Sequence, residues 1–91
     1  MEFEWDPAKA AGNLHKHKVS FEEAASVFGD ALGATVPDPD HSVVEERFIT
    51  VGLSNRGRLP MVAHTQRLER VHIISARALS RREKGAYEET R

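Results

Sequence analysis

The 91-residue chain contains no cysteine and few aromatic residues, and these absences exclude whole classes of protein. Without cysteine there is no disulfide, no thiolate nucleophile, and no zinc or iron–sulfur site with sulfur ligands. One Trp, one Tyr and four Phe leave little aromatic surface for a large core. A chain of this length forms one domain with a modest core, so we predict a single domain over residues 1–91.

Long apolar runs are also missing, since no uninterrupted apolar stretch exceeds four residues. A membrane-spanning helix needs about 20 apolar residues. The first residues, Met1 to Glu4, include two acidic side chains, unlike the basic start of a signal peptide. We therefore expect a cytoplasmic location and no membrane association.

No motif for a metal ion or a cofactor is recognisable. The five His residues are scattered, and none forms the helical i, i+4 pair with a neighbouring Glu that is typical of zinc enzymes. A glycine-rich phosphate loop and a serine nucleophile elbow are also missing. We expect no metal and no cofactor, so any reaction must use His, Arg, Lys, Tyr and carboxylate side chains.

The charges are divided unequally between the two parts of the chain, although the net charge is only −1. Residues 1–55 contain four basic and ten acidic side chains, whereas residues 56–91 contain nine basic and four acidic ones. Eight of those nine basic residues are Arg, whose planar guanidinium suits bidentate contact with phosphate or carboxylate. The second part of the chain is therefore expected to meet a polyanion or an acidic partner.

The first part of the sequence predicts a short strand and two helices. Residues 3–5 have a strand pattern, and Asp6-Pro7 is a typical helix start, so a helix is expected to about residue 17. Ser20 and Glu23 have the spacing of a capping box, which predicts a second helix after them.

From residue 31 onward the apolar residues alternate with a period of two, which predicts strands. The last part, from Ser80, begins with a second capping box and predicts a third helix to about Glu89. Pro60 is expected near a strand start or on an edge. The expected strands cover residues 32–36, 47–53, 59–65 and 71–76, with turns at 37–41, 54–57 and 66–70. We predict an α+β domain with an antiparallel sheet whose helices cover one face.

This inventory of polar side chains is sufficient for metal-independent RNA cleavage, in which the ribose 2′-OH attacks its own phosphate. His64, Arg67, Arg70, His72 and Arg77 lie near adjacent strand ends, where several cations could surround one phosphate. A structural alternative is equally simple: His64 alternates with the apolar Val62 as a sheet histidine, and the arginines are solvated surface charges.

Polar residues of the helices are further candidates. Lys16 and His17 end the first helix, where they either cap the helix dipole or act on RNA, with His17 as acid or base. Arg82 and Tyr87 lie on the last helix, which is either a charged exposed face or a phosphate-binding strip.

Several motifs together resemble the BrnT family of type II toxins. The likeness spans nearly the whole chain, and its most specific parts are the N-terminal motif and Ile73-Ile74-Ser75-Ala76-Arg77. The matching residues are Phe3-x-Trp5-Asp6-Pro7-x-Lys9, Asn13-Leu14-x-Lys16-His17-x-Val19-Ser20-Phe21-Glu22-Glu23-Ala24, Pro37-Asp38, Arg47-Phe48-Ile49-x-x-Gly52-x-Ser54, Arg82-Glu83 and Tyr87.

The resemblance implies a RelE-like fold, ribonuclease activity that stops translation, and neutralisation by a BrnA-type antitoxin that binds DNA and represses the shared operon. The sequence departs from the family at Lys18, where Gly is usual, and at His72, where Arg is usual. If Lys18 is left-handed, it costs about 1 kcal/mol. The predicted catalytic residues are His17, His64, Glu22, Arg67 and Arg77, and the predicted RNA-binding residues are Lys16, Arg47, Arg70, His72, Arg82 and Tyr87.

The leading hypothesis is therefore a metal-independent ribonuclease toxin in which His17, His64 and Arg77 lie within about 10 Å of each other. The alternative is a catalytically weak or inactive module that binds a BrnA-type antitoxin. Direct DNA binding is not expected, because the sequence has no helix-turn-helix signature.

Overall fold

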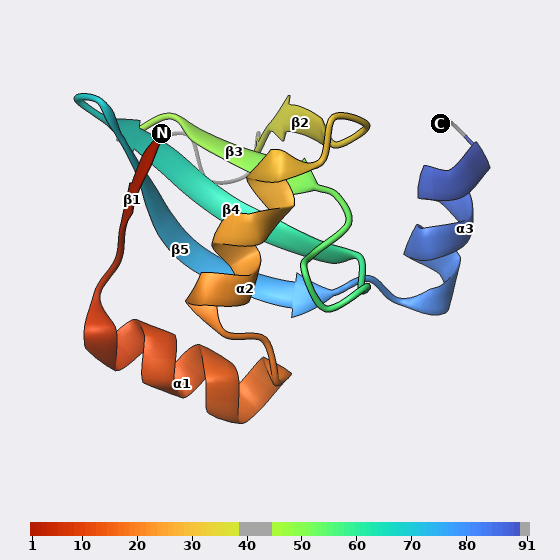
Figure 1. Ribbon diagram of the computed structural model, residues 1–91, viewed down its shortest axis with the longest axis horizontal. Helices are drawn as coiled ribbons and strands as arrows, with labels where there is room; N and C mark the ends of the chain where they lie inside the picture. The colour runs from red at the N-terminus through yellow and green to blue at the C-terminus, as the bar shows by residue number, and fades with distance from the viewer. Residues whose placement is uncertain (39–44, 90–91) are drawn as a thin grey trace.

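The computed structural model describes residues 1–38 and 45–89, and within them the chain forms a five-stranded sheet and three α-helices (Figure 1). The expected α+β class is confirmed. The turn expected at residues 37–41 lies partly outside the described residues. The elements are β1 (Glu2–Glu4), α1 (Pro7–His17), α2 (Phe21–Ser26), the 3-10 turn η1 (Val27–Gly29), β2 (Ala34–Pro37), β3 (Arg47–Val51), β4 (Pro60–Arg67), β5 (Arg70–Ala78) and α3 (Arg81–Glu89).

The sheet is mixed, so the prediction of a fully antiparallel sheet is wrong. Its strand order is β1-β5-β4-β3-β2, and β1 runs parallel to β5, with Phe3 opposite Val71. The remaining strand pairs are antiparallel, as expected. A period-two pattern identifies a strand but contains no information about its neighbour or its direction. The half-buried Phe3 instead holds β1 in place, since its ring packs against Phe28 at a centroid distance of 5.2 Å.

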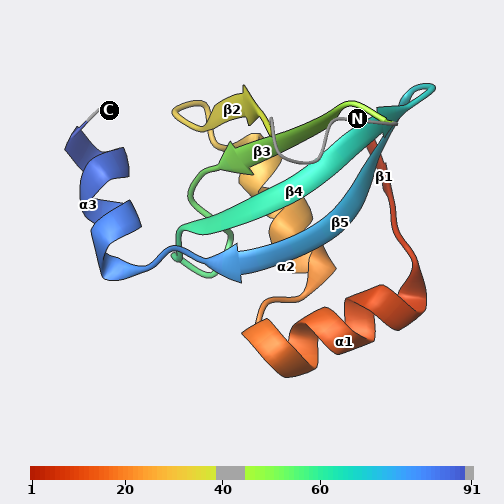
Figure 2. The same ribbon diagram turned by 180° about the vertical axis from the view of Figure 1, so that it is seen from behind.

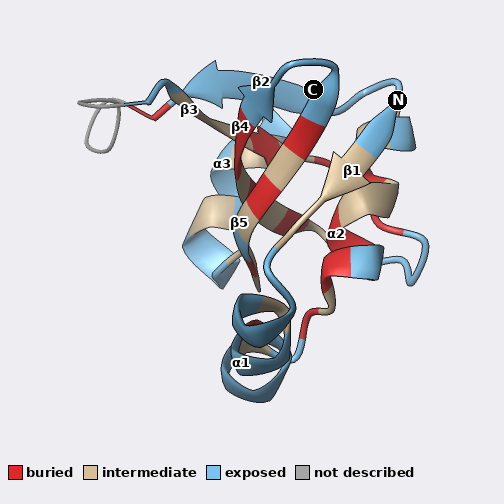
Figure 3. Ribbon diagram, turned by 90° about the vertical axis from the view of Figure 1, so that its left-hand side faces the viewer, coloured by how far each residue is buried: buried red, intermediate tan, exposed pale blue. Residues whose placement is uncertain are grey.

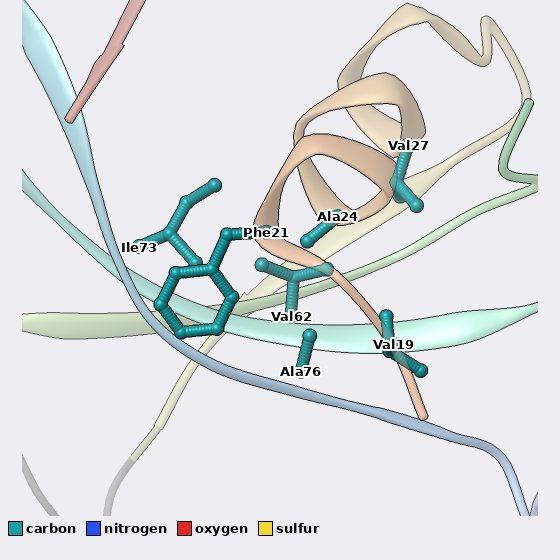
Figure 4. Packing of buried hydrophobic residues seen from close by; sticks show 7 residues of the cluster. All are labelled: Val19, Phe21, Ala24, Val27, Val62, Ile73 and Ala76. Carbon is teal, nitrogen blue, oxygen red and sulfur yellow. The ribbon is translucent and has the colours of Figure 1, made fainter. Parts of the chain in front are cut away.

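The core lies between α2 and one face of the sheet. Residues from α2 and the segments flanking it pack against side chains of β4 and β5, and burial alternates along these two strands (Figures 3 and 4). Removing this apolar surface from water stabilises the fold at roughly 25 cal/mol per Å². The buried cluster consists of Val19, Phe21, Ala24, Val27, Val62, Ile73 and Ala76.

The third helix does not belong to this layer, so the expectation that the helices together cover one face is wrong for α3. None of its residues is buried, and it stands beyond the end of β5 (Figure 2). A reciprocal capping box starts it: Ser80 N donates to Glu83 Oε1 at 2.9 Å, and Glu83 N donates to Ser80 Oγ at 3.2 Å. The Tyr87 hydroxyl lies 3.1 Å from the Leu32 carbonyl before β2 and 3.4 Å from the Val51 carbonyl of β3, and so attaches the far end of α3 to the sheet.

The side chain of Asn13 attaches α1 to the edge of β5. Its Nδ2 donates to the Ala76 carbonyl at 2.8 Å, and its Oδ1 accepts from the Ala76 N–H at 3.1 Å. Strand β1 pairs with β5 only at residues 70–72, so the amide of Asn13 satisfies backbone groups beyond the reach of that pairing. The same Nδ2 donates to the Val19 carbonyl at 2.9 Å. Asn13 therefore fixes the last turn of α1 against the edge of the sheet.

The end of α1 is left-handed at Lys18, with φ of 60° and ψ of 28°. This conformation is the one in which a non-glycine residue costs about 1 kcal/mol. Arg58 supports it, since Nη2 donates to the Lys18 carbonyl at 2.9 Å. The same guanidinium forms an ion pair with the buried Glu23, and Nε donates to Glu23 Oε2 at 2.9 Å. One arginine thus joins the end of α1, the start of α2 and the loop before β4.

Candidate active site on the open face of the sheet

The face of the sheet opposite α2 contains a hollow of about 380 Å³. Figure 2 views the strands from this side, with α2 behind them. The floor comes from three adjacent strands, where the apolar Ile49 pairs with Ala63 and Ala63 pairs with the polar Ser75. The lining residues are His17, Asp38, Arg47, Ile49, Met61, Ala63, Ser75, Ala76 and Arg77.

Three of the predicted site residues meet at this cavity, although they come from separate elements. His17 is the last residue of α1, Arg47 the first residue of β3, and Arg77 lies near the end of β5 opposite Met61. Because α1 is attached at Ala76, its C-terminal histidine reaches the rim of the hollow. The arrangement places one proton-transfer group and two guanidinium groups around the hollow, which is suited to an anion.

The Arg77 guanidinium is held in a bidentate ion pair by α3. Nη1 lies 2.8 Å from Glu83 Oε1, and Nη2 lies 2.9 Å from Glu83 Oε2. The hydrogen bonds from Arg77 lower the pKa of the Glu83 carboxyl to about 2, and the same contact raises the pKa of Arg77. Both groups are therefore charged throughout the neutral range. The pair fixes the plane of the guanidinium at the cavity edge.

His64 does not lie with these residues. Its side chain is buried on the α2 side of the sheet, where its ring packs against Phe28 at 4.8 Å and Phe48 at 6.0 Å. Nε2 is 2.7 Å from Thr50 Oγ1. Alternation with the core residue Val62 is the sequence signal that accounts for this placement. His17 and Arg77 thus line the same cavity, whereas His64 lies on the other face of the sheet.

Burial lowers the pKa of His64, which leads to a testable dependence of stability on pH. At this position the unfolded chain binds a proton more readily than the folded chain does. The contribution of neutral His64 to the free energy of unfolding is therefore complete above the ordinary pKa of 6.5 and is lost as the pH drops below it. We expect urea unfolding to show a decline between pH 6.5 and 5 of at most about 1.4 kcal/mol per pH unit. The His64→Gln variant should lack this slope, and an unchanged slope would contradict the assignment.

Three further predicted residues lie near the turn that joins β4 to β5, at the end of the sheet where β3 begins, and they are outside the cavity lining. Each is close to a carboxylate: Arg67 Nε is 3.1 Å from Glu45, Arg70 Nε is 3.9 Å from Glu2, and His72 Nδ1 is 3.4 Å from Glu4. These contacts, like that of Arg58 with Glu23, join the basic second part of the chain to its acidic first part. The charge asymmetry of the sequence is thus partly balanced within the fold.

The remaining predicted residues lie outside the cavity lining. Lys16 and Glu22 are exposed on α1 and α2, and Arg82 is exposed on α3. None of them lines the cavity. The Tyr87 hydroxyl is directed to backbone carbonyls of Leu32 and Val51, at 3.1 and 3.4 Å, and so serves to attach α3.

Two polar lining residues were not singled out in the sequence as site residues. Asp38, expected in a turn, is buried at 7% exposure and follows β2 directly. Its backbone N–H donates to the Arg47 carbonyl at 2.9 Å, which continues the β2–β3 ladder and places Asp38 opposite Arg47. Ser75 lies on the open face of β5. Residues two apart on a strand point to the same face of the sheet. This spacing places Asp38 on the face of Val36 and Ser75 on the face of Arg77, and it is the sequence signal that would have identified both residues.

Within residues 1–38 and 45–89, no cluster of three or more His, Asp or Glu side chains is arranged to hold a metal ion. Over the same part of the chain, no helix is both long and apolar enough to cross a membrane.

Comparison with known proteins identifies the family. The family described as "Ribonuclease toxin, BrnT, of type II toxin-antitoxin system" matches residues 5–83. Among solved structures, the fold is similar to that of the Brucella abortus ribonuclease toxin BrnT, with a TM-score of 0.69 over 89% of this chain and 99% of that chain. The two sequences are 21% identical, so this likeness concerns the fold. No curated protein matches the chain. The match over residues 5–83 shows that the chain belongs to the BrnT family of ribonuclease toxins of type II toxin–antitoxin systems.

Proposed function

We propose that the open-face cavity cleaves RNA without a metal ion and that this cleavage inhibits translation in the cytoplasm. The observation that carries the proposal is the meeting of His17, Arg47 and Arg77, from three separate elements, at one hollow of about 380 Å³. Two arginines at a concave site supply the positive charge that a phosphodiester requires. Histidine is the side chain that exchanges a proton near neutral pH.

The reaction is an internal transfer. The ribose 2′-oxygen bonds to the adjacent phosphorus, the bond from phosphorus to the 5′-oxygen breaks, and the products carry a 2′,3′-cyclic phosphate and a 5′-hydroxyl. His17 either takes the proton of the 2′-hydroxyl or supplies the proton to the 5′-oxygen, and water handles the other one. Arg47 and Arg77 offset the charge that develops on the pentacoordinate phosphorane.

Membership of a toxin–antitoxin family implies an antitoxin partner, and we propose that it is of the BrnA type. An acidic segment of that partner can cover Arg47 and Arg77 and so exclude RNA from the cavity. Contact with operator DNA is then made by the antitoxin alone.

Purified chain incubated with RNA and excess EDTA tests the proposed activity. We expect fragments with 2′,3′-cyclic phosphate ends, formed at an unchanged rate in EDTA because no step needs a metal ion. The antitoxin, added in equimolar amount, should stop the reaction. Absence of cleavage together with tight antitoxin binding would instead favour a non-catalytic module, a candidate supported by the carboxylate contacts of Arg67, Arg70 and Arg77.

A further inference from the structure

The ion pair between Arg77 and Glu83 connects the cavity to α3, a helix with no buried residue. The start of the helix fixes the carboxylate, since Ser80 N donates to Glu83 Oε1 at 2.9 Å and Glu83 N donates to Ser80 Oγ at 3.2 Å. Glu83 is thereby turned back toward Arg77, six residues earlier in the chain. An acidic group beside a cavity proposed to bind RNA requires an explanation, because it repels phosphate.

The hydrogen bonds of Arg77 use one end of its guanidinium. A guanidinium has five N–H donors in a fixed planar arrangement. Nη1 and Nη2 donate to the two oxygens of Glu83 at 2.8 and 2.9 Å, and Nη1 also lies 3.3 Å from the Ala78 carbonyl. The Nε–H and the second N–H of Nη2 remain, and no hydrogen bond to another described residue uses Nε. These two donors share an edge of the guanidinium that can form a second bidentate contact.

The Arg77 side chain remains accessible on the open face of the sheet. Ala76 is buried in the core at 2% exposure, so Arg77, the next residue, leaves β5 on the opposite face. There it lines the hollow together with Met61, its partner across the β4–β5 ladder. The side chain is 43% exposed in spite of its pair with Glu83. A phosphate can therefore bind Arg77 without displacing Glu83.

We infer that Glu83 is a positioning residue of the proposed ribonuclease, which holds the Nη1–Nη2 end of Arg77 so that the Nε–Nη2 edge meets the phosphate of the RNA. The inference rests on the proposed function, since it concerns the same cavity. An arginine that is already held loses less side-chain entropy when the transition state forms. Its two parallel donors then stabilise the charge of the phosphorane. Lysine cannot replace it, because a point charge does not offer two bidentate edges.

The Glu83→Gln variant tests this role, because the amide has nearly the same shape but accepts with only one of its two terminal atoms. We expect it to cleave RNA about tenfold more slowly in single turnovers. It should bind an uncleavable 2′-fluoro oligonucleotide at least as tightly as the unaltered chain, since a negative charge near the phosphate is gone. An unchanged cleavage rate, or binding that weakens in proportion to the rate, overturns the inference.

Two variants of the same region are matched controls. Ser80→Ala removes the side-chain cap of α3 but keeps both partners of the Arg77 ion pair, and Glu88→Gln removes another exposed carboxylate of the helix. Both should cleave at nearly the normal rate. A loss in Ser80→Ala as large as that in Glu83→Gln would mean that Glu83 acts only by capping the helix, and the inference would be wrong.

A double-mutant cycle decides whether Glu83 acts through Arg77. Arg77→Lys should slow single-turnover cleavage about tenfold or more, and Glu83→Gln added to Arg77→Lys should slow it no further. Reductions that multiply would show that the two residues act independently, which contradicts a positioning role.

The proposed edge can also be observed without cleavage. In heteronuclear NMR spectra, the Nε–H resonance of Arg77, assigned by its loss in Arg77→Lys, should shift on addition of the 2′-fluoro oligonucleotide. The shift should be smaller in Glu83→Gln. If that variant does not fold, the unaltered chain still decides whether Nε contacts the ligand. Failure to bind, or an unshifted resonance at saturation, overturns the inference. A shift that depends on Glu83, in a chain that cleaves no RNA, supports the positioning of Arg77 and contradicts the ribonuclease proposal alone.

Discussion

The His17→Ala variant is expected to cleave RNA at least about 100-fold more slowly than the unaltered chain, with a KM changed by less than about threefold. The reason is that, among the described residues, His17 is the one histidine that lines the cavity, so its removal deletes proton transfer but leaves the two arginines proposed to bind phosphate. Single-turnover cleavage of a short oligonucleotide gives the rate, and its dependence on enzyme concentration gives the binding constant.

The chain offers a close control for this experiment. His15 is exposed on the same last turn of α1 and does not line the cavity, so His15→Ala should cleave at nearly the normal rate. Arg47→Ala and Arg67→Ala make a second matched pair, in which only the first removes a lining residue. If His15→Ala or Arg67→Ala lost as much activity as its partner, the reaction would have to lie elsewhere on the surface.

The Arg58→Ala variant is expected to lose about 2 kcal/mol of unfolding free energy. Its removal leaves the carboxylate of Glu23, at 2% exposure, without its cationic partner. The hydrogen bond from Arg58 is also the main reason that the pKa of Glu23 lies below its ordinary value. Removing one partner of a fully buried pair costs about 3–5 kcal/mol. The smaller figure is expected here because the Arg58 side chain is itself 37% exposed.

Urea unfolding at pH 7 measures this loss. Arg56 is exposed in the same loop, so Arg56→Ala is a suitable control and should stay within about 0.5 kcal/mol of the unaltered chain. Adding Glu23→Gln to Arg58→Ala should recover part of the stability, because a neutral amide is cheaper to bury than a lone carboxylate. An Arg58→Ala variant as stable as Arg56→Ala would show that the pair contributes nothing.

The local parts of the fold could be predicted from the sequence because their signals act over a few residues. Asp6 caps α1, accepting from Ala8 N at 2.8 Å, and Ser20 caps α2, accepting from Glu23 N at 3.0 Å. Pro60 starts β4, where its missing N–H costs nothing. The parallel pairing of β1 with β5 joins residues that are far apart in sequence, and no local pattern contains that information.

For the candidate site too, the local features could be predicted from the sequence and the long-range ones could not. His17 and Arg77 were recognisable as polar residues at element ends, and both line the cavity. His64 has the same chemistry, but the face to which it points is decided by its alternation with Val62 and by packing against Phe28. Asp38 was interpreted as a turn residue because it lies between prolines, and only the register with β3 shows that it faces Arg47.

The bond between Asn13 and Ala76 has a consequence for self-association. An uncovered strand edge is a template on which another chain can add a strand and begin an aggregate. Here the N–H and carbonyl of Ala76 are already occupied by a side-chain amide of the same molecule. A substitution of Asn13 would thus detach the first helix from the sheet. It would also leave the backbone groups of Ala76 open to pairing with a strand of another molecule.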